Sequence, residues 1–178
     1  MKDFLEKIKL IEYFTVELEI QKFDFVSILK KHVDEGDTGI FSDTFDIFSS
    51  SKNEYKGQVD FNGFKIKRRK RLFDMNMNFA IAKGNFSQKN EKLIVETEVN
   101  GFSNMMIPFY IIGVVFYTIF IGAFFMADNI EGNGVGFALP FILIHGAFMF
   151  GIPYVFMRRS AKRMKYELER EFYYLIKK

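Results

Sequence analysis

The densest group of residues that could bind a ligand is a basic run at residues 65–71, in which six of seven side chains are Lys or Arg. Successive side chains of a strand point to opposite faces, so we expect one face to carry Lys65, Lys67, Arg69 and Arg71. This face could be a solvated surface balanced by the chain's own acids, a surface for anionic lipid headgroups, or a pocket for an anionic ligand such as a nucleotide.

Nucleic acid is a poor fit to this basic run. Residues 1–104 carry 17 basic and 17 acidic side chains, which leaves no net positive charge to attract a phosphate backbone. We therefore expect no nucleic-acid partner.

Residues that support catalysis or metal binding are sparse. The chain has no Cys, and its two histidines, His32 and His145, lie far apart. It has no glycine-rich phosphate loop ending in Lys-Ser/Thr, no Gly-x-Ser-x-Gly and no His-Glu-x-x-His, and its acids show no spacing typical of a general acid–base pair. The sequence predicts no catalytic residue, no metal site, no cofactor and no enzymatic activity.

Two long apolar segments organise the chain. Residues 105–127 and 135–157 each form a run of 23 uncharged residues, and about 20 apolar residues suffice to cross a bilayer. The linker 128–134 is short and rich in turn formers. The sequence predicts an antiparallel transmembrane hairpin over 105–157, between an N-terminal domain of residues 1–104 and a basic tail of residues 158–178.

Basic residues near the ends of these spans predict their orientation. Arg158, Arg159, Lys162 and Arg163 follow the second span, whereas the linker between the spans has no Lys or Arg. Basic residues are enriched on the cytoplasmic side, so we expect both ends of the chain to be cytoplasmic and the linker to face outward. The four residues are also candidates for contact with anionic lipids.

Small residues recur at helical spacing inside the spans, as Thr118 with Gly122 and as Ala147 with Gly151. Small residues four positions apart allow helix backbones to approach closely. These pairs are expected to pack the hairpin on itself, with packing against another copy or another subunit as the alternative.

His145 lies near the middle of the second predicted span, where an ionisable side chain is costly and usually has a partner. We expect a neutral imidazole that is hydrogen-bonded to Thr118 or to a backbone carbonyl freed by Pro140. A proton relay and a contact with a partner subunit are the alternatives, although neither span contains an acid or a base that would continue a relay.

In the N-terminal domain, some segments show the two-residue hydrophobic period of a strand and one shows the period of about 3.6 residues of a helix. Period-two alternation at 14–20, around 41–47, and at 55–61, 64–72, 75–82 and 93–99 predicts strands, and the stripe within 22–33 predicts a helix. Asn62-Gly63 predicts a tight hairpin, because both residues accept positive φ. We expect an α+β fold, with a small antiparallel sheet and one packed helix.

The tail has apolar residues every three or four positions, which predicts an amphipathic helix that continues from the second span. The stripe consists of Ala161, Met164, Leu168, Phe172 and Leu175. We expect it to dock on the N-terminal sheet, with self-association or binding to the membrane surface as alternatives.

Three short motifs carry a resemblance. Lys56-Gly-Gln-Val59, Phe64-Lys-Ile-Lys-Arg68 and Ala82-Lys-Gly84 precede a paired span. Over residues 55–126 the chain resembles a group of uncharacterised small bacterial membrane proteins with a strand-rich cytoplasmic domain and two membrane helices. It departs from their Arg-Asn-Ser-Phe segment, which here reads Met75-Asn-Met-Asn-Phe79. The resemblance implies this architecture and a bacterial origin, and no particular mechanism. With the predicted orientation, we expect the protein to lie in the bacterial inner membrane.

The sequence therefore predicts a non-enzymatic integral membrane protein whose partners are the lipid bilayer and a further protein or a second copy. Its cytoplasmic domain would bind a partner or an anionic ligand at the membrane face, as an accessory, assembly or sensor subunit. The alternative is an oligomeric channel or membrane-permeabilising effector built from the hairpins.

Overall fold

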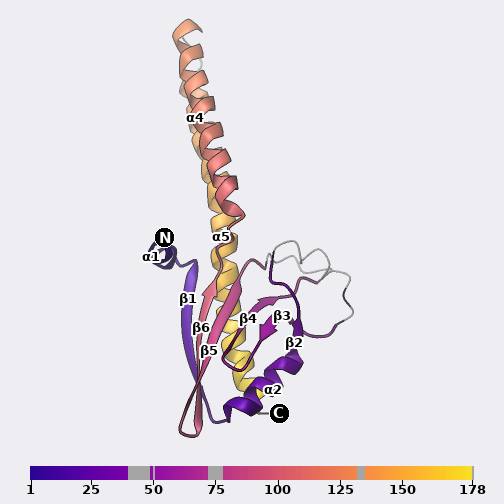
Figure 1. The fold of residues 1–178 in the computed structure, drawn as a ribbon. Helices are drawn as coiled ribbons and strands as arrows, with labels where there is room; N and C mark the ends of the chain where they lie inside the picture. The colour runs from indigo at the N-terminus through magenta and orange to yellow at the C-terminus, as the bar shows by residue number, and fades with distance from the viewer. Residues whose placement is uncertain (40–48, 50, 72–77, 132–134, 178) are drawn as a thin grey trace. The chain divides into compact units, whose positions relative to one another are not determined.

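A computed structural model describes residues 1–39, 49, 51–71, 78–131 and 135–177. The chain divides into a sheet unit, Met1–Phe102 with Met157–Lys178, and a hairpin unit, Ser103–Phe156. Figure 1 shows the helices α1 (Lys2–Lys7), α2 (Lys22–His32), α4 (Met106–Glu131) and α5 (Val135–Leu175). The strands are β1 (Ile11–Leu18), β2 (Val33–Glu35), β3 (Tyr55–Val59), β4 (Gly63–Arg68), β5 (Ile81–Lys89) and β6 (Lys92–Asn100).

The six strands form one mixed sheet in the order β1-β6-β5-β4-β3-β2. The α+β class is as predicted, but the expectation of a purely antiparallel sheet is wrong, because β2 pairs with β3 in parallel. β2 was missed because it is three residues long and follows α2 directly, at Val33, whose backbone is already extended. Val33, its one apolar residue, continues the apolar stripe of the helix, so periodicity alone does not separate the two elements.

Two further strand predictions differ from the structure. The strand expected at 75–82 begins at Ile81 and continues to Lys89, well beyond its expected end. The polar side chains of Asn85 and Ser87 are exposed on one face of this strand, while Phe86 is buried on the other. The strand expected around 41–47 lies outside the described residues, as do residues 72–77.

The predicted hairpin at Asn62-Gly63 is present between β3 and β4, although for a different reason. The Asp60 carboxylate accepts hydrogen bonds from the backbone N–H groups of Asn62 and Gly63 at 2.9 and 3.0 Å. Gly63 is required because a Cβ there would lie 2.2 Å from the carbonyl oxygen of Gly84. Within the described part of the chain, positive φ at glycine occurs at Gly57, with φ of 147°.

The core lies on the sheet face that is covered by α2 and by the last part of α5, both visible along the strands in Figure 1. The predicted stripe of the tail is buried there in full. Phe172 is completely buried, and its ring centre lies 5.7 Å from that of Phe64, 5.6 Å from that of Phe25 and 6.2 Å from that of Phe14. Phe172 thus contacts two strands and α2 together.

Ion pairs hold the tail helix on both sides of this apolar stripe. Lys165 Nζ lies 3.2 Å from Glu12 Oε2 on β1. At the other side, Glu167 is paired with Arg68 of β4 and with Arg163, whose Nε lies 2.9 Å from Glu167 Oε1. These pairs are partly exposed and contribute orientation more than net stability.

Replacing Phe172 by Ala should destabilise the sheet unit by about 3–5 kcal/mol, because it removes the ring that joins the strands to α2 and leaves a cavity. Chemical denaturation of the full chain in detergent, followed by the circular dichroism of the sheet, measures this loss. Tyr173→Ala is the matched control, since Tyr173 is 44% exposed. Equal losses in the two variants would contradict the central role of Phe172.

Candidate functional site

The sheet face opposite α2 and the tail helix, here called the outer face, carries four lysines on adjacent strands. The register pairs Lys56 of β3 with Lys67 of β4, and Lys65 of β4 with Lys83 of β5. Side chains that are directly opposite in an antiparallel pair lie on the same face, with Cβ atoms about 4.5–5.5 Å apart. The four lysines therefore form two neighbouring rows.

The first row is closed to solvent. Lys56 is 3% exposed and Lys67 is 2% exposed, and both have polar or electrostatic contacts. The expectation that Lys67 belongs to an open basic surface is therefore wrong. Alternation along β4 predicted the face on which Lys67 lies but not its burial, because strand periodicity does not show what covers a face.

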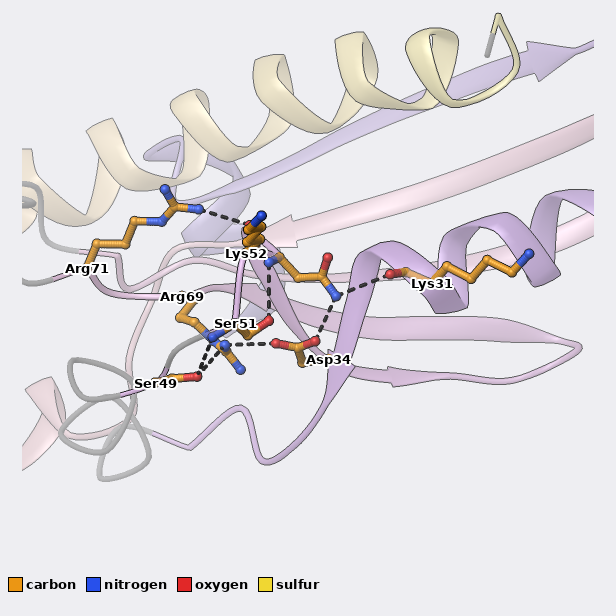
Figure 2. Close-up of polar contacts among 8 residues, drawn as sticks. Lys31, Asp34, Ser49, Ser51, Lys52, Arg69 and Arg71 are labelled. Carbon is orange, nitrogen blue, oxygen red and sulfur yellow. Dashed lines mark hydrogen bonds and ion pairs between the residues drawn. The ribbon is translucent and has the colours of Figure 1, made fainter.

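A polar network lies beside this closed row, at the edge formed by β2 (Figure 2). Arg69 Nη1 is 2.8 Å from Asp34 Oδ2 and donates a hydrogen bond of 2.8 Å to Ser49 Oγ. Asn53 Nδ2 donates to Asp34 Oδ1 at 2.7 Å and to the Lys31 carbonyl oxygen at 3.2 Å. The network ties β2 and the end of α2 to the residues that precede β3.

Arg69 and Arg71 are part of this framework. The charge of Arg69 is compensated by Asp34, and Arg71 Nη2 donates to the carbonyl oxygen of Lys52 at 3.1 Å. Burial alone would raise the pKa of Asp34, but hydrogen bonds from Ser51 and Asn53 and the charge of Arg69 outweigh it and lower that pKa. Two of the four predicted ligand-binding residues thus stabilise the fold.

The second row is open. Lys65 and Lys83 are exposed, and neither has an ion pair or a hydrogen bond among the residues that the structure describes. Lys83 was missed as a site residue because the predicted strand ended at Ala82. Had that strand been extended, the register would have placed Lys83 opposite Lys65. Of the predicted basic surface, only Lys65 is both exposed and without a partner among the described residues. Lys83, which was not predicted, lies beside it.

A pocket of about 270 Å³ adjoins Lys65 at the edge of the sheet. Its lining combines the Lys65 ammonium group with two acids, Glu35 and Asp37, and with Gly36, Thr38 and Gln58. Two carboxylates against one ammonium group repel a polyanion, so this pocket does not suit a nucleotide. The open row fits an anion better than the pocket does.

The predicted basic cluster that follows the second apolar segment lies on α5. Arg158, Arg159 and Lys162 are exposed, whereas Arg163 is half-buried in its ion pair with Glu167. Three of the four predicted lipid contacts thus present their side chains to solvent, and the fourth holds the tail helix in place.

The small residues that pack the hairpin unit differ from those predicted. A Cβ at Gly113 would lie 2.9 Å from the Phe150 ring, and one at Gly146 would lie 3.5 Å from the Tyr117 ring. A glycine of α4 thus lies against an aromatic ring of α5, and a glycine of α5 lies against an aromatic ring of α4. Gly122 and Gly151 have no described atom within 4 Å of the corresponding position, so they do not pack the hairpin on itself. Their partners Thr118 and Ala147 are also exposed.

His145 has a hydrogen-bond partner, but it is Tyr117 and not Thr118. Its Nδ1 atom is within hydrogen-bonding distance of the Tyr117 hydroxyl, while the Thr118 hydroxyl donates to the Val114 carbonyl oxygen of its own helix at 2.8 Å. The Phe141 ring stacks beside His145, with ring centres 6.3 Å apart. The expected polar partner exists, although it comes from the neighbouring position on the first helix.

Among the described residues, no group of three or more His, Asp or Glu side chains could hold a metal ion. Comparison of the chain with models of protein families, with curated proteins and with solved structures finds no match. The resemblance over residues 55–126 therefore stays a prediction.

Asp34→Asn should destabilise the sheet unit by about 1–2 kcal/mol at neutral pH, because it removes the charge that pairs with Arg69. The folded state lowers the pKa of Asp34 below its ordinary value of 3.8. The carboxylate therefore contributes stability above that value, and this contribution is lost as the pH falls through the lowered pKa. Denaturant unfolding at a series of pH values should show the two proteins converging in acid.

Glu19→Gln is the control for this series, since Glu19 is an exposed acid at the end of β1. A constant difference between Asp34→Asn and the original chain down to the most acidic pH would show that the carboxylate charge is not responsible.

Proposed function

We propose that this chain is a non-enzymatic integral membrane protein, which anchors an α+β binding domain to the cytoplasmic side of a bacterial inner membrane. Two helices are long and apolar enough to cross a membrane, and the apolar windows of α4 and α5 are only 0% and 6% buried. A core helix of a soluble protein would be mostly buried. This exposure of apolar side chains is the observation that carries the proposal.

The charge distribution supports the orientation. Arg158, Arg159 and Lys162 follow the apolar part of α5 within about two helical turns, and their side chains are exposed. In the cytoplasmic leaflet each basic residue near anionic headgroups contributes roughly 1 kcal/mol. We propose that these three residues contact anionic lipids and retain both ends of the chain in the cytoplasm.

A binding role is supported by the way the sheet unit uses its charges. Asp34 with Arg69, and Glu167 with Arg68, are ion pairs that join separate elements of the fold. The exposed Lys65 and Lys83 lack such partners among the described residues. The sheet unit would thus act as a sensor, accessory or assembly module that is held at the membrane.

The orientation can be tested with single cysteines, because the chain has none of its own. In intact cells, Asn133→Cys should react with a membrane-impermeant thiol reagent, and Ser51→Cys should react only after the inner membrane is permeabilised. Joint replacement of Arg158, Arg159 and Lys162 by Ser should increase the fraction of inverted molecules. Labelling of Ser51→Cys in intact cells, or recovery of the chain in the soluble fraction, would refute the proposal.

A second candidate function is an oligomeric channel or permeability effector, which is favoured by the outward-facing glycines of the hairpin. The positions above Gly122 and Gly151 are open, and small residues drive close packing of membrane helices. His145 is also exposed on this hairpin, beside its partner Tyr117. Several hairpins could pack through these surfaces around a polar path.

Oligomerisation through these glycines predicts that Gly122→Leu with Gly151→Leu dissociates a detergent-stable complex. The substitutions fill space that is open in one chain, so the single hairpin should keep its fold. Gly113→Leu is the contrasting variant, because it would clash with Phe150 and disturb the hairpin itself. Size-exclusion chromatography with light scattering measures the mass, and an unchanged mass in the double variant would argue against the channel.

A further inference from the structure

Lys65 and Lys83 form a pair of positive charges at the middle of the outer face, and neither makes an ion pair with a described residue. They are directly opposite each other on β4 and β5, and like charges in this arrangement destabilise a sheet. Both side chains are exposed, and neither ammonium group has a partner among the described residues. Repulsion between the two ammonium groups therefore lowers the stability of the free protein, and a bound anion would relieve that repulsion.

The acids nearest in the register do not remove this charge. Glu98 follows Lys83 in the same row, but its Oε2 lies 2.7 Å from Lys2 Nζ, so it has a basic partner already. On the other side of Lys65 the row continues to Gln58, which is neutral. The row of Lys56 and Lys67 ends at Asp34, which is paired with Arg69. The row on the other side contains Glu96 of β6, which is diagonal to Lys83, and no ion pair joins these two described side chains.

The remaining two lysines of the outer face, Lys56 and Lys67, are buried in the adjacent row. They are opposite each other on β3 and β4 and have polar or electrostatic contacts of their own, whereas Lys65 and Lys83 are on β4 and β5. Lys65 and Lys83 are the two members of the group that solvent reaches.

We propose that Lys65 and Lys83 together bind one phosphate monoester group between their ammonium groups. Each ammonium group offers three donors on a flexible stem, and a phosphate monoester accepts at three oxygens. At neutral pH its charge is close to −2, which neutralises both lysines, whereas a single carboxylate would neutralise one. Glu35 and Asp37 line the pocket on one side of Lys65, so a phosphate held by both lysines would lie on the side of Lys65 that faces Lys83.

The inference rests on the proposed function in one respect: membrane anchoring is what would bring the sheet unit near lipid phosphate groups. A domain held at a bilayer meets phosphate monoesters both as lipid headgroups, such as that of phosphatidic acid, and as free soluble compounds. The recognition chemistry is the same for both, so the two sources are separated by experiment. Because the site is exposed, binding should weaken as the ionic strength rises.

The test uses the full chain in nanodiscs of zwitterionic phosphatidylcholine, with isotope-labelled lysine side chains followed by nuclear magnetic resonance. In one arm, glycerol 3-phosphate is titrated into the sample. In the other, phosphatidic acid is included in the nanodisc. We expect saturable shifts at Lys65 and Lys83 in at least one arm, and the arm that responds identifies the source. Saturation in neither arm would overturn the inference.

Two double variants distinguish phosphate binding at Lys65 and Lys83 from a general effect of positive charge on the affinity. Lys65→Ser with Lys83→Ser should weaken binding about tenfold or more, since it removes both ammonium contacts. Lys89→Ser with Lys92→Ser is the matched control: these two exposed lysines are also directly opposite each other, and Lys92 lies 3.7 Å from Glu17. Equal weakening in both double variants would overturn the inference.

A stability readout confirms that the test variant is folded. Without ligand, Lys65→Ser with Lys83→Ser should unfold at the same temperature as the original chain or a higher one, because like-charge repulsion is relieved. Thiol labelling of the membrane topology is independent of these measurements. A correctly inserted chain that binds no phosphate would refute this inference and leave the proposed membrane anchoring in place.

Discussion

The sheet unit depends on one packing interaction, in which the end of the chain covers the apolar face of a sheet made by its beginning. Phe172 is fully buried among rings from β1, β4 and α2. An apolar sheet face must be buried against another element, and α2 is only 11 residues long. The core cluster includes both helices, so the sheet unit is incomplete without Met157–Lys178. This requirement ties the tail to the sheet, whatever the membrane context.

The charges of the sheet unit follow from the same constraint. Ion pairs at the rim of the core join elements that are far apart in the sequence. Examples are Lys165 with Glu12 and Arg68 with Glu167. A near balance of acids and bases in residues 1–104 suits this use. The outer face differs at Lys65 and Lys83, which are exposed and form no ion pair with a described residue. A local excess of charge in a neutral domain is therefore more informative than the net charge.

The hairpin unit packs through different contacts, which suit the proposed membrane setting, since lipid supplies no hydrophobic driving force between helices. Phe150 lies against Gly113 and Tyr117 lies against Gly146, so each backbone approaches an aromatic ring of the other helix. Tyr117 also supplies the partner that an imidazole at position 145 needs. The glycines that face away from this seam, Gly122 and Gly151, are left for lipid or for another molecule.

The sequence by itself determined the segregation of apolar and charged segments, the α+β class, the β3–β4 hairpin and the burial of the tail stripe, because each of these follows from local periodicity and composition. It did not determine the parallel pairing of β2, the extent of β5 or the partner of His145. Nor could it show that Lys67 is buried and Arg69 paired while Lys65 and Lys83 are exposed. Those features depend on register and on which distant segment covers each row, and only the tertiary structure sets both.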